Sequence, residues 1–262
     1  MASTSPSASL DFLKLLAHDV RWYLLSALAE SDRRVQELVT LLQRPQNLIS
    51  YHLRLLREGQ VVKERRSSAD GRDVYYSLDL ALFQTLYQES GMALHPALAC
   101  TQPGQAEESE VMVERPFRIL FLCTHNSARS QLAEGILRAS GGKLVTVFSA
   151  GSKPGGVHPL AIRAADALGF DISQQQSRHM DEFVGQKFDY VITVCDQVRE
   201  VCPVFPNEPQ QIHWSFPDPA AVVGSEADQF AAFVQTAQAL TIRINYLRQM
   251  IVLRQEENKE SK

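Results

Sequence analysis

The distribution of apolar residues changes once along this chain of 262 residues, and the change divides the chain into two parts. Residues 94–114 lack apolar periodicity and contain prolines, a glycine and a run of glutamates. Before this stretch apolar residues recur at helical spacing, whereas after it short apolar runs alternate with longer amphipathic stretches, as in an α/β domain. We therefore expect a first domain at residues 1–93, a linker at 94–115 and a second domain at 116–255.

Composition and the start of the chain limit the class of protein. A net charge of −4 argues against a wholly basic coat for nucleic acid, although one local basic face is compatible with it. The first nine residues are small and polar, unlike a signal peptide, and no stretch has the roughly 20 apolar residues of a membrane helix. We therefore expect a cytoplasmic protein. In a reducing compartment its four cysteines, Cys100, Cys123, Cys195 and Cys202, point to catalysis, redox chemistry or metal binding rather than structural disulfides.

Helices followed by a β-hairpin are predicted for the first domain. The expected helices lie at residues 10–17, 20–28 and 35–42, a fourth is expected to open at Pro45 and Asn47 and to run up to Gly59, and the expected strands lie at 61–66 and 73–78. Pro45 precedes the fourth helix and Gly59 ends it, as is common for these residue types. A helix, a short turn, a second helix and a hairpin form the order of a winged helix-turn-helix.

The fourth helix carries amide, hydroxyl and arginine side chains on one face, and such groups bind base edges or phosphates. The predicted DNA-contacting residues are Gln46, Asn47, Ser50, Tyr51, His52, Arg54 and Arg57 of this helix, with Arg65 and Arg66 of the hairpin. Lys63 and Arg72 add positive charge to the hairpin. The alternative is a solvated helix face followed by a polar hairpin, but the ordered succession of helix, helix and basic hairpin favours DNA binding.

The segment QNLISYHLRLLREGQVVKERRSSADGRDVYYSL, residues 46–78, resembles the core of the ArsR-type repressors, and LLAHDVRWYLLSAL, residues 15–28, resembles their opening helix. The resemblance implies a homodimer that binds a double-stranded DNA operator and leaves it when a metal or metalloid binds. The best-known sensor of that family is a cysteine pair before the reader helix, where residues 33–38 of this chain contain no cysteine. Direct arsenite sensing by this domain is therefore not expected. Cys100 is interpreted as a linker thiol, although a dimer would bring two of them.

In the second domain a cysteine follows a buried type of strand, residues 117–122, and precedes an amphipathic helix. The loop between them, predicted to bind an oxyanion, is Cys123-Thr124-His125-Asn126-Ser127-Ala128-Arg129-Ser130. Small residues let backbone N–H groups point inward, the helix N-terminus adds its positive dipole end, and Arg129 can grip two oxygens. The same field favours the thiolate of Cys123, to which Ser130 can donate. The alternative is a buried structural cysteine at a strand end.

Four segments in order resemble the low-molecular-weight tyrosine phosphatase fold and, within it, the thioredoxin-coupled arsenate reductases. They are FLCTHNSARSQLAEGIL, FSAG, FDYVITVCDQVREVCPVFP and HWSFPDPA. The resemblance implies an α/β domain with a parallel four-stranded sheet flanked by helices. Phosphatases of this fold need Cys123, Arg129 and a late aspartate, here Asp218, which is expected to act as a general acid or as a proton acceptor for a thiol. The alternative for Asp218 is a plain turn residue between prolines.

The resemblance also implies a role for Cys195 and Cys202, which a phosphatase does not need. In the family's scheme Cys123 forms an adduct with arsenate, Cys195 attacks Cys123 and releases arsenite, and Cys202 then attacks Cys195. Thioredoxin or a similar dithiol reduces the resulting disulfide.

The spacing of the two later cysteines predicts a moving part. On one intact helix they would lie about 10 Å apart, whereas a disulfide needs Cα atoms within about 7 Å. Residues 196–201 are therefore expected to bend or unwind on oxidation. Zinc binding is the alternative, but the two cysteines lack the close pairing of a zinc knuckle.

Some relatives in this family bind potassium beside the oxyanion loop, at positions that match Asn126, Glu134 and Ser149. The fourth position falls near Gln176, where a threonine is expected. No tightly bound cofactor is expected apart from this ion.

Three functions are compatible with these motifs. The first is an arsenate reductase fused to a DNA-binding transcriptional regulator. The second is a non-catalytic regulator that senses arsenate, phosphate or redox state, and the third is a low-molecular-weight tyrosine phosphatase fused to a repressor. The complete set of Cys123, Arg129, Cys195, Cys202 and Asp218 favours the first.

Overall fold

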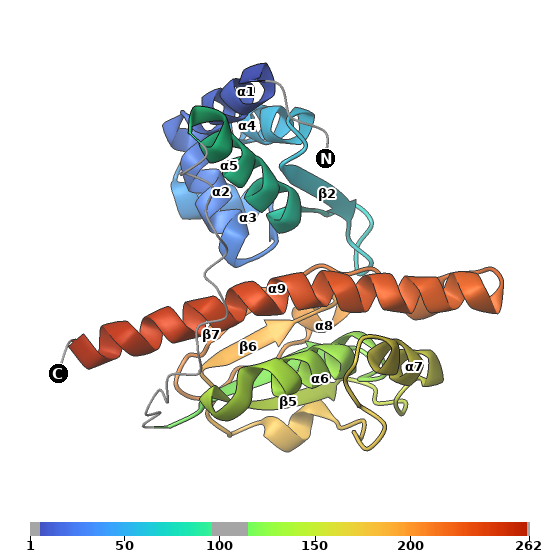
Figure 1. Ribbon diagram of the computed structural model, residues 1–262. Helices are drawn as coiled ribbons and strands as arrows, with labels where there is room; N and C mark the ends of the chain where they lie inside the picture. The colour runs from blue at the N-terminus through green and yellow to red at the C-terminus, as the bar shows by residue number, and fades with distance from the viewer. Residues whose placement is uncertain (1–5, 96–114, 261–262) are drawn as a thin grey trace. The chain divides into compact units, whose positions relative to one another are not determined.

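The computed structural model describes residues 6–95 and 115–260, and the chain divides into two compact units, Met1–Met112 and Val113–Lys262 (Figure 1). Most of the predicted linker, residues 94–115, and Cys100 lie outside the described residues. The domain boundaries and the role of Cys100 therefore stay predictions. None of the helices in the described ranges is both long and apolar enough to span a bilayer.

The first unit has the predicted succession of helices and a hairpin. Its elements are α1 (Pro6–Leu16), α2 (Asp19–Glu30), β1 (Arg33–Arg34), α3 (Val35–Leu42), α4 (Gln46–Glu58), β2 (Val62–Arg66), β3 (Val74–Leu78) and α5 (Leu80–Leu94). The three strands form one antiparallel sheet in the order β1-β3-β2. On α4, Ile49, Leu53 and Leu56 are buried at helical spacing, which turns the opposite face of α4 outward.

Two elements of this unit were not predicted. The two-residue strand β1 pairs with β3 immediately before α3. Helix α5 is capped by Asp79, whose side chain accepts a hydrogen bond from the backbone N–H of Leu82 at 3.2 Å. Helix α5 packs on α1, where the rings of Phe12 and Phe83 meet edge to face with centroids 5.4 Å apart.

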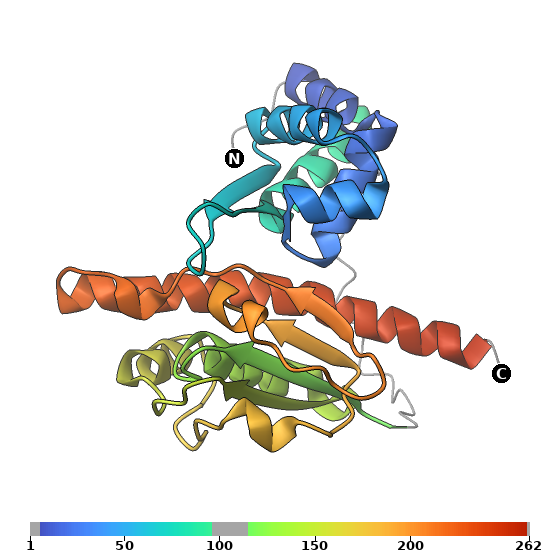
Figure 2. The ribbon, with the colours of Figure 1, turned by 180° about the vertical axis from the view of Figure 1, so that it is seen from behind.

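The second unit is built on a parallel sheet of four strands in the order β5-β4-β6-β7, which confirms the predicted fold class (Figure 2). The strands are β4 (Phe117–Cys123), β5 (Val145–Gly151), β6 (Tyr190–Thr193) and β7 (Gln210–His213). The central strand β6 is buried throughout, as is typical of a parallel sheet. Because the strands are parallel, their carboxyl ends, Cys123, Gly151, Thr193 and His213, lie at one edge, where α/β proteins bind ligands.

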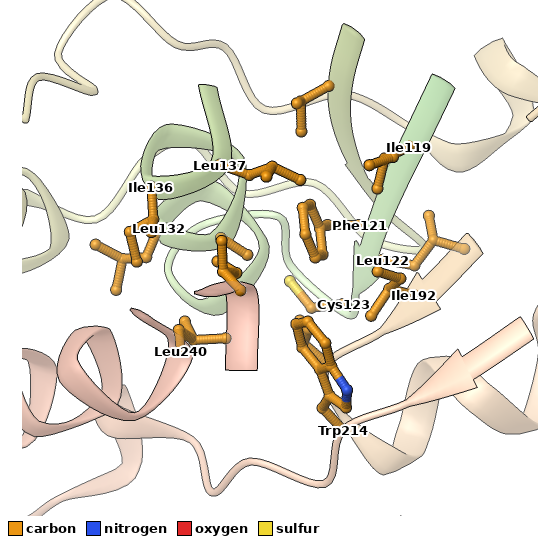
Figure 3. Close-up of a cluster of buried hydrophobic side chains, with 14 of the residues drawn as sticks. Ile119, Phe121, Leu122, Cys123, Leu132, Ile136, Leu137, Ile192, Trp214 and Leu240 are labelled. Carbon is orange, nitrogen blue, oxygen red and sulfur yellow. The ribbon is translucent and has the colours of Figure 1, made fainter. Parts of the chain in front are cut away.

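Helices of very different length complete this unit. They are α6 (Arg129–Gly141), α7 (Pro159–Ala167), α8 (Asp196–Glu200) and α9 (Glu226–Glu260), with short 3-10 turns η2 (Gly142–Leu144), η3 (Met180–Phe183) and η4 (Pro219–Ala221). Helix α6 packs on β4, β5 and α9. The buried residues of α9 follow a helical stripe, Phe233, Ala237, Leu240, Ile244, Leu247 and Ile251. Figure 3 shows the resulting core, with Cys123 at the end of β4 beside Phe121 and Trp214.

Candidate active site

The loop between β4 and α6 has all its carbonyl groups turned to the surrounding chain. The carbonyl oxygens of residues 124–128 accept hydrogen bonds from N–H groups of residues 153, 155, 158 and 132 and from the side chains of Ser177 and Gln131. The N–H groups of such a loop face the opposite way, and that of Asn126 donates to the Sγ atom of Cys123 at 3.2 Å. The loop therefore forms a cradle of N–H groups at the N-terminus of α6, where an anion is stabilised.

Asn126 holds the shape of this cradle. It is fully buried and has a left-handed backbone with φ of 46°. Its Oδ1 atom accepts from the backbone N–H of Arg178 at 2.7 Å and from Gln131 at 3.0 Å. Gly151 lies under the loop, because a Cβ atom there would come within 2.6 Å of the carbonyl oxygen of Thr124. A side chain at this glycine would displace the loop.

Cys123 occupies the floor of the cradle and is 2% exposed. Its Sγ atom lies 2.9 Å from the Oγ atom of Ser130. Ser130 also accepts from Nδ2 of Asn126 at 2.9 Å, so the hydroxyl proton is left to point at the sulfur. Two hydrogen-bond donors are thus directed at Sγ of Cys123, the arrangement expected around a nucleophilic sulfur.

Arg129, the first residue of α6, is paired with the predicted late aspartate. Its Nη2 atom lies 3.1 Å from Oδ2 of Asp218, and its Nη1 atom donates to the carbonyl oxygen of Phe216 at 3.0 Å. The arginine side chain is 7% exposed and the aspartate 35%. A guanidinium held as a planar fork can bind two oxygens of a tetrahedral anion, and the adjacent carboxylate can exchange protons with that anion.

Cys195 lies directly beside the cradle. It caps α8, is 1% exposed, and its Sγ atom is 3.3 Å from the hydroxyl of Thr124, the loop residue that follows Cys123. Burial raises the pKa of the Cys195 thiol, and negative charge on Cys123 raises it further. The positive charge of Arg129 and the hydrogen bond from Thr124 act in the opposite direction.

Cys202 lies just beyond the other end of α8 and is half-buried. Its Sγ atom donates weakly to the carbonyl oxygen of Pro203 at 3.8 Å. Burial raises its pKa to about 11. In the reduced protein this thiol is therefore held in its unreactive, protonated form near neutral pH.

We expect the alkylation of Cys202 by iodoacetamide to be slow and steeply pH-dependent. Only the thiolate reacts, and a pKa of about 11 leaves the thiolate fraction rising about tenfold per pH unit between pH 8 and pH 10. Peptide mass spectrometry after timed alkylation measures the rate. The unfolded chain in guanidinium chloride is the control, where the rate should level off near pH 9.5 because an ordinary thiol has a pKa of about 8.5. A folded-state rate that levels off at the same pH would contradict this expectation.

The three residues of the predicted potassium site lie together. Nδ2 of Asn126 donates to Ser149 at 2.8 Å, and Ser149 donates to Oε2 of Glu134 at 2.5 Å. Arg138 pairs with the other carboxylate oxygen of Glu134. Burial raises the pKa of Glu134 despite these partners. Asn126 thus presents a donor to this cluster and Arg138 supplies a cation, which together fit a hydrogen-bond network better than an oxygen-lined potassium site.

The structure adds polar residues that the sequence analysis missed. Asp196 and His213 are buried with a 3.2 Å contact between Oδ1 and Nε2, and Ser215 donates to the same carboxylate oxygen at 2.7 Å. Their signal was available in part, because Thr193 and His213 end neighbouring parallel strands. His125, by contrast, is the exposed residue of the loop. Among the residues that the structure describes, no three or more histidine, cysteine, aspartate or glutamate side chains are arranged to hold a metal ion.

On helix α4 of the first unit, nearly all the predicted DNA-contacting residues are exposed. The exposed ones are Gln46, Asn47, Ser50, Tyr51, Arg54 and Arg57. His52 is the exception, since it is 3% exposed and its ring lies 4.3 Å from that of His18, centroid to centroid. Burial and the nearby His18 and Arg21 lower its pKa. The prediction that His52 contacts DNA is therefore corrected, because its side chain points into the unit.

Ion pairs neutralise part of the positive charge on the hairpin and on α4. Arg57 pairs with Glu64, Lys63 lies 2.6 Å from Asp79, and Arg72 lies 2.7 Å from Asp70. Arg66 is exposed at the end of β2 and donates to the carbonyl oxygen of Gly71 at 3.1 Å. The local field of this surface is therefore weaker than the count of basic residues suggests.

Comparison with known families agrees with both units. Residues 118–251 match the model of the low molecular weight phosphotyrosine protein phosphatases, so the chain belongs to this family. Residues 18–64 match the model described as bacterial regulatory protein, arsR family, and the first unit thus carries an ArsR-family helix-turn-helix. Both resemblances predicted from the sequence are confirmed.

The curated relatives are more specific. An arsenate reductase of Halalkalibacterium halodurans is 40% identical over 126 residues, which make up 48% of this chain and 91% of that protein. An arsenate reductase of Brevibacillus brevis is 42% identical over 118 residues, 45% of this chain and 86% of that protein. A solved structure described as an arsenate reductase in oxidized state aligns with 51% of this chain and 98% of its own at 28% identity, with a TM-score of 0.46.

Proposed function

We propose that this protein is an arsenate reductase that uses Cys123, Cys195 and Cys202 in turn, joined to a DNA-binding regulator of arsenic resistance. The observation that carries the proposal is the contact between Thr124 and Cys195, which brings a second thiol to the edge of an anion cradle. A phosphatase needs no second thiol, whereas reduction of arsenic takes two electrons from a thiol pair. The relatives whose sequences align with this chain over most of their own length are named arsenate reductases.

In the first step arsenate lies in the loop cradle with two oxygens on Arg129. The Cys123 thiolate attacks the arsenic atom, an S–As bond forms, and one oxygen leaves as water after taking a proton. Asp218, 3.1 Å from Arg129, is the acid beside that oxygen. The N–H groups of the loop stabilise the negative charge of the transition state.

In the second step the Cys195 thiolate attacks Sγ of Cys123. The S–S bond forms, the S–As bond breaks, and its electron pair stays on arsenic, which leaves as arsenite. Cys195 must lose its proton first, against the effect of burial. Arg129 and the hydroxyl of Thr124 favour the thiolate at the position from which it attacks.

In the third step Cys202 attacks Sγ of Cys195, and Cys123 leaves as the thiolate ready for another cycle. Helix α8 separates the two cysteines in the reduced protein, so it must unwind for their sulfurs to meet. The Cys195–Cys202 disulfide then exchanges with an external dithiol, for which thioredoxin is our proposed donor.

The test is arsenate-dependent oxidation of NADPH in the presence of thioredoxin and thioredoxin reductase. Turnover by the unaltered protein, lost in Cys195→Ser, supports the reductase. Hydrolysis of an aryl phosphate by a protein that is inactive toward arsenate with every thiol donor would instead support the phosphatase. Inactivity in both assays would leave a regulator that uses the fold to sense an anion. The scheme contains no potassium step, because the Asn126, Ser149 and Glu134 cluster fits that ion poorly.

The DNA-binding part of the proposal rests on the exposed polar face of α4 and the family of the first unit. A homodimer on a double-stranded operator is proposed because paired reader helices match paired half-sites. A cytoplasmic location is part of the same proposal.

We expect Arg66→Ala to weaken binding to all DNA sequences alike. An exposed arginine at the hairpin contacts phosphate rather than bases, so its loss should reduce the slope of log affinity against log salt by about 1. Fluorescence anisotropy over a salt series, on operator and random duplexes, measures both effects. Arg163→Ala in the second unit, also an exposed arginine, is the control. An unchanged slope would remove Arg66 from the DNA surface.

A further inference from the structure

A buried polar cluster lies beside Cys195 and takes no part in the chemistry described above. Its members are Thr193, Asp196, His213 and Ser215. Asp196 is fully buried and His213 is 3% exposed. A carboxylate is expensive to bury unless it is paired and hydrogen-bonded, and the neighbours of Asp196 supply those partners.

The hydrogen bonds of the cluster have one consistent direction. The Asp196 carboxylate only accepts, and its Oδ1 atom receives the hydroxyl of Ser215 at 2.7 Å and Nε2–H of His213 at 3.2 Å. Nδ1 of His213 lies 2.8 Å from the hydroxyl of Thr193, and with Nε2 as the donor to Asp196 a neutral ring accepts from that hydroxyl, whose other acceptor, the carbonyl oxygen of Ile212, is farther away at 3.4 Å. One imidazole therefore joins the end of β6 to the start of α8.

The two residues joined in this way flank Cys195. Thr193 is the last residue of β6 and pairs in register with His213, the last residue of β7. Asp196 is the first residue of α8, which Cys195 caps. His213 at the edge of the sheet thus contacts Thr193 before Cys195 and Asp196 after it, and these contacts hold the backbone of Cys195 on both sides. The residues of α8 that follow Asp196 lie beyond these contacts.

We propose that the Asp196–His213 pair is a positioning device that holds the Cys195 thiol against the Cys123 loop and keeps it there while the remainder of α8 unwinds toward Cys202. The inference rests on the proposed function. Asp196 and His213 touch no reacting atom, and they act through the backbone of Cys195. A displacement of about 1 Å at a reacting group can cost about 100-fold in rate, so loss of these contacts should slow the attack of Cys195 on Cys123.

The test uses thiol oxidation, which needs no arsenate. In a protein with Cys100→Ser and Cys202→Ser, diamide takes two electrons and two protons from Cys123 and Cys195, and their disulfide forms. Peptide mapping without reduction measures its rate. We expect Asp196→Ala to slow this step at least about tenfold. Asp189→Ala is the matched control, because Asp189 is a paired carboxylate next to the other end of β6, bonded to Arg115.

Two milder variants separate positioning from folding. Asp196→Asn keeps an oxygen that accepts from His213 and Ser215, and it should restore most of the rate. Thr193→Val keeps the shape of the strand and removes only the hydroxyl, and it should slow the step by a few-fold. Introduced into the protein with all its cysteines, the same substitutions should lower kcat for arsenate and leave KM for arsenate unchanged, because the anion cradle is intact.

Equal rates of disulfide formation in Asp196→Ala and Asp189→Ala would overturn the positioning role, as would a loss that follows melting temperature across all variants. If the unaltered protein fails to reduce arsenate while diamide still separates the Asp196 and Asp189 variants, the reductase proposal fails and the positioning role stands. If Asp196→Ala does not fold, Thr193→Val decides alone, and an unchanged rate in it would overturn the role.

Discussion

Arg129→Lys is expected to lower kcat/KM for arsenate by about 100- to 1000-fold, the range found when a donor to a developing oxyanion is lost. The guanidinium is almost fully buried and is held as a fork by Asp218 and the carbonyl oxygen of Phe216. A lysine keeps the charge but cannot offer two parallel N–H groups, and its shorter reach leaves Asp218 without its partner.

Steady-state reduction with thioredoxin measures this effect, and Arg163→Lys is the matched control. Arg163 is also paired with a carboxylate, that of Glu226, but it lies on the exposed surface of α7. Its substitution should leave the rate unchanged. A similar rate in Arg129→Lys and the unaltered protein would mean that Arg129 does not bind the oxyanion in the transition state.

Cys202→Ser is expected to abolish turnover while leaving the release of one arsenite per chain. The first two steps of the proposed cycle need only Cys123 and Cys195, and these residues meet through Thr124 whether or not Cys202 is present. The reaction should stop at the Cys123–Cys195 disulfide, which has no internal thiol left to open it. Quenched-flow measurement of arsenite, with mass spectrometry of the trapped disulfide, tests this result.

Cys100→Ser is the control for that experiment, since it removes a thiol that the proposed cycle does not use. It should turn over like the unaltered protein. Continued turnover in Cys202→Ser would show that an external dithiol opens the Cys123–Cys195 disulfide directly, and it would remove the need for α8 to unwind.

The oxyanion loop could be predicted from the sequence because its chemistry is contiguous. A strand, the run from Cys123 to Ser130 and a helix that begins at Arg129 specify the cradle locally. The Asp196–His213 pair could not be predicted in this way, because parallel pairing of β6 with β7 brings these residues together. The sequence indicates the two strand ends, but it does not show that β6 and β7 are neighbours in the sheet.

In the first unit the structure differs from the sequence predictions at His52 and at helix α5, and both differences have physical causes. His52 lies on α4 among exposed polar residues, but it follows the helical stripe of Ile49, Leu53 and Leu56 closely enough to be buried. The residue type of His52 suggested a contact with DNA, but its position on the helix places its side chain in the interior of the unit. Helix α5 was not predicted because its apolar residues show no strong helical periodicity. The helix on which it packs, α1, is distant in sequence.

The outward hydrogen bonds of the loop carbonyls mean that the anion cradle exists before any anion arrives. The loop of such a site needs little reorganisation when an anion binds. For the same reason it cannot distinguish tetrahedral oxyanions by closing around them. Phosphate should therefore compete with arsenate for the same N–H groups. Discrimination falls to the redox step, because arsenic bound to Cys123 can accept the electron pair when Cys195 attacks, whereas phosphorus in the same position holds its oxidation state. In a chain built this way phosphate would slow the reaction as a competitor, and only arsenic would be reduced.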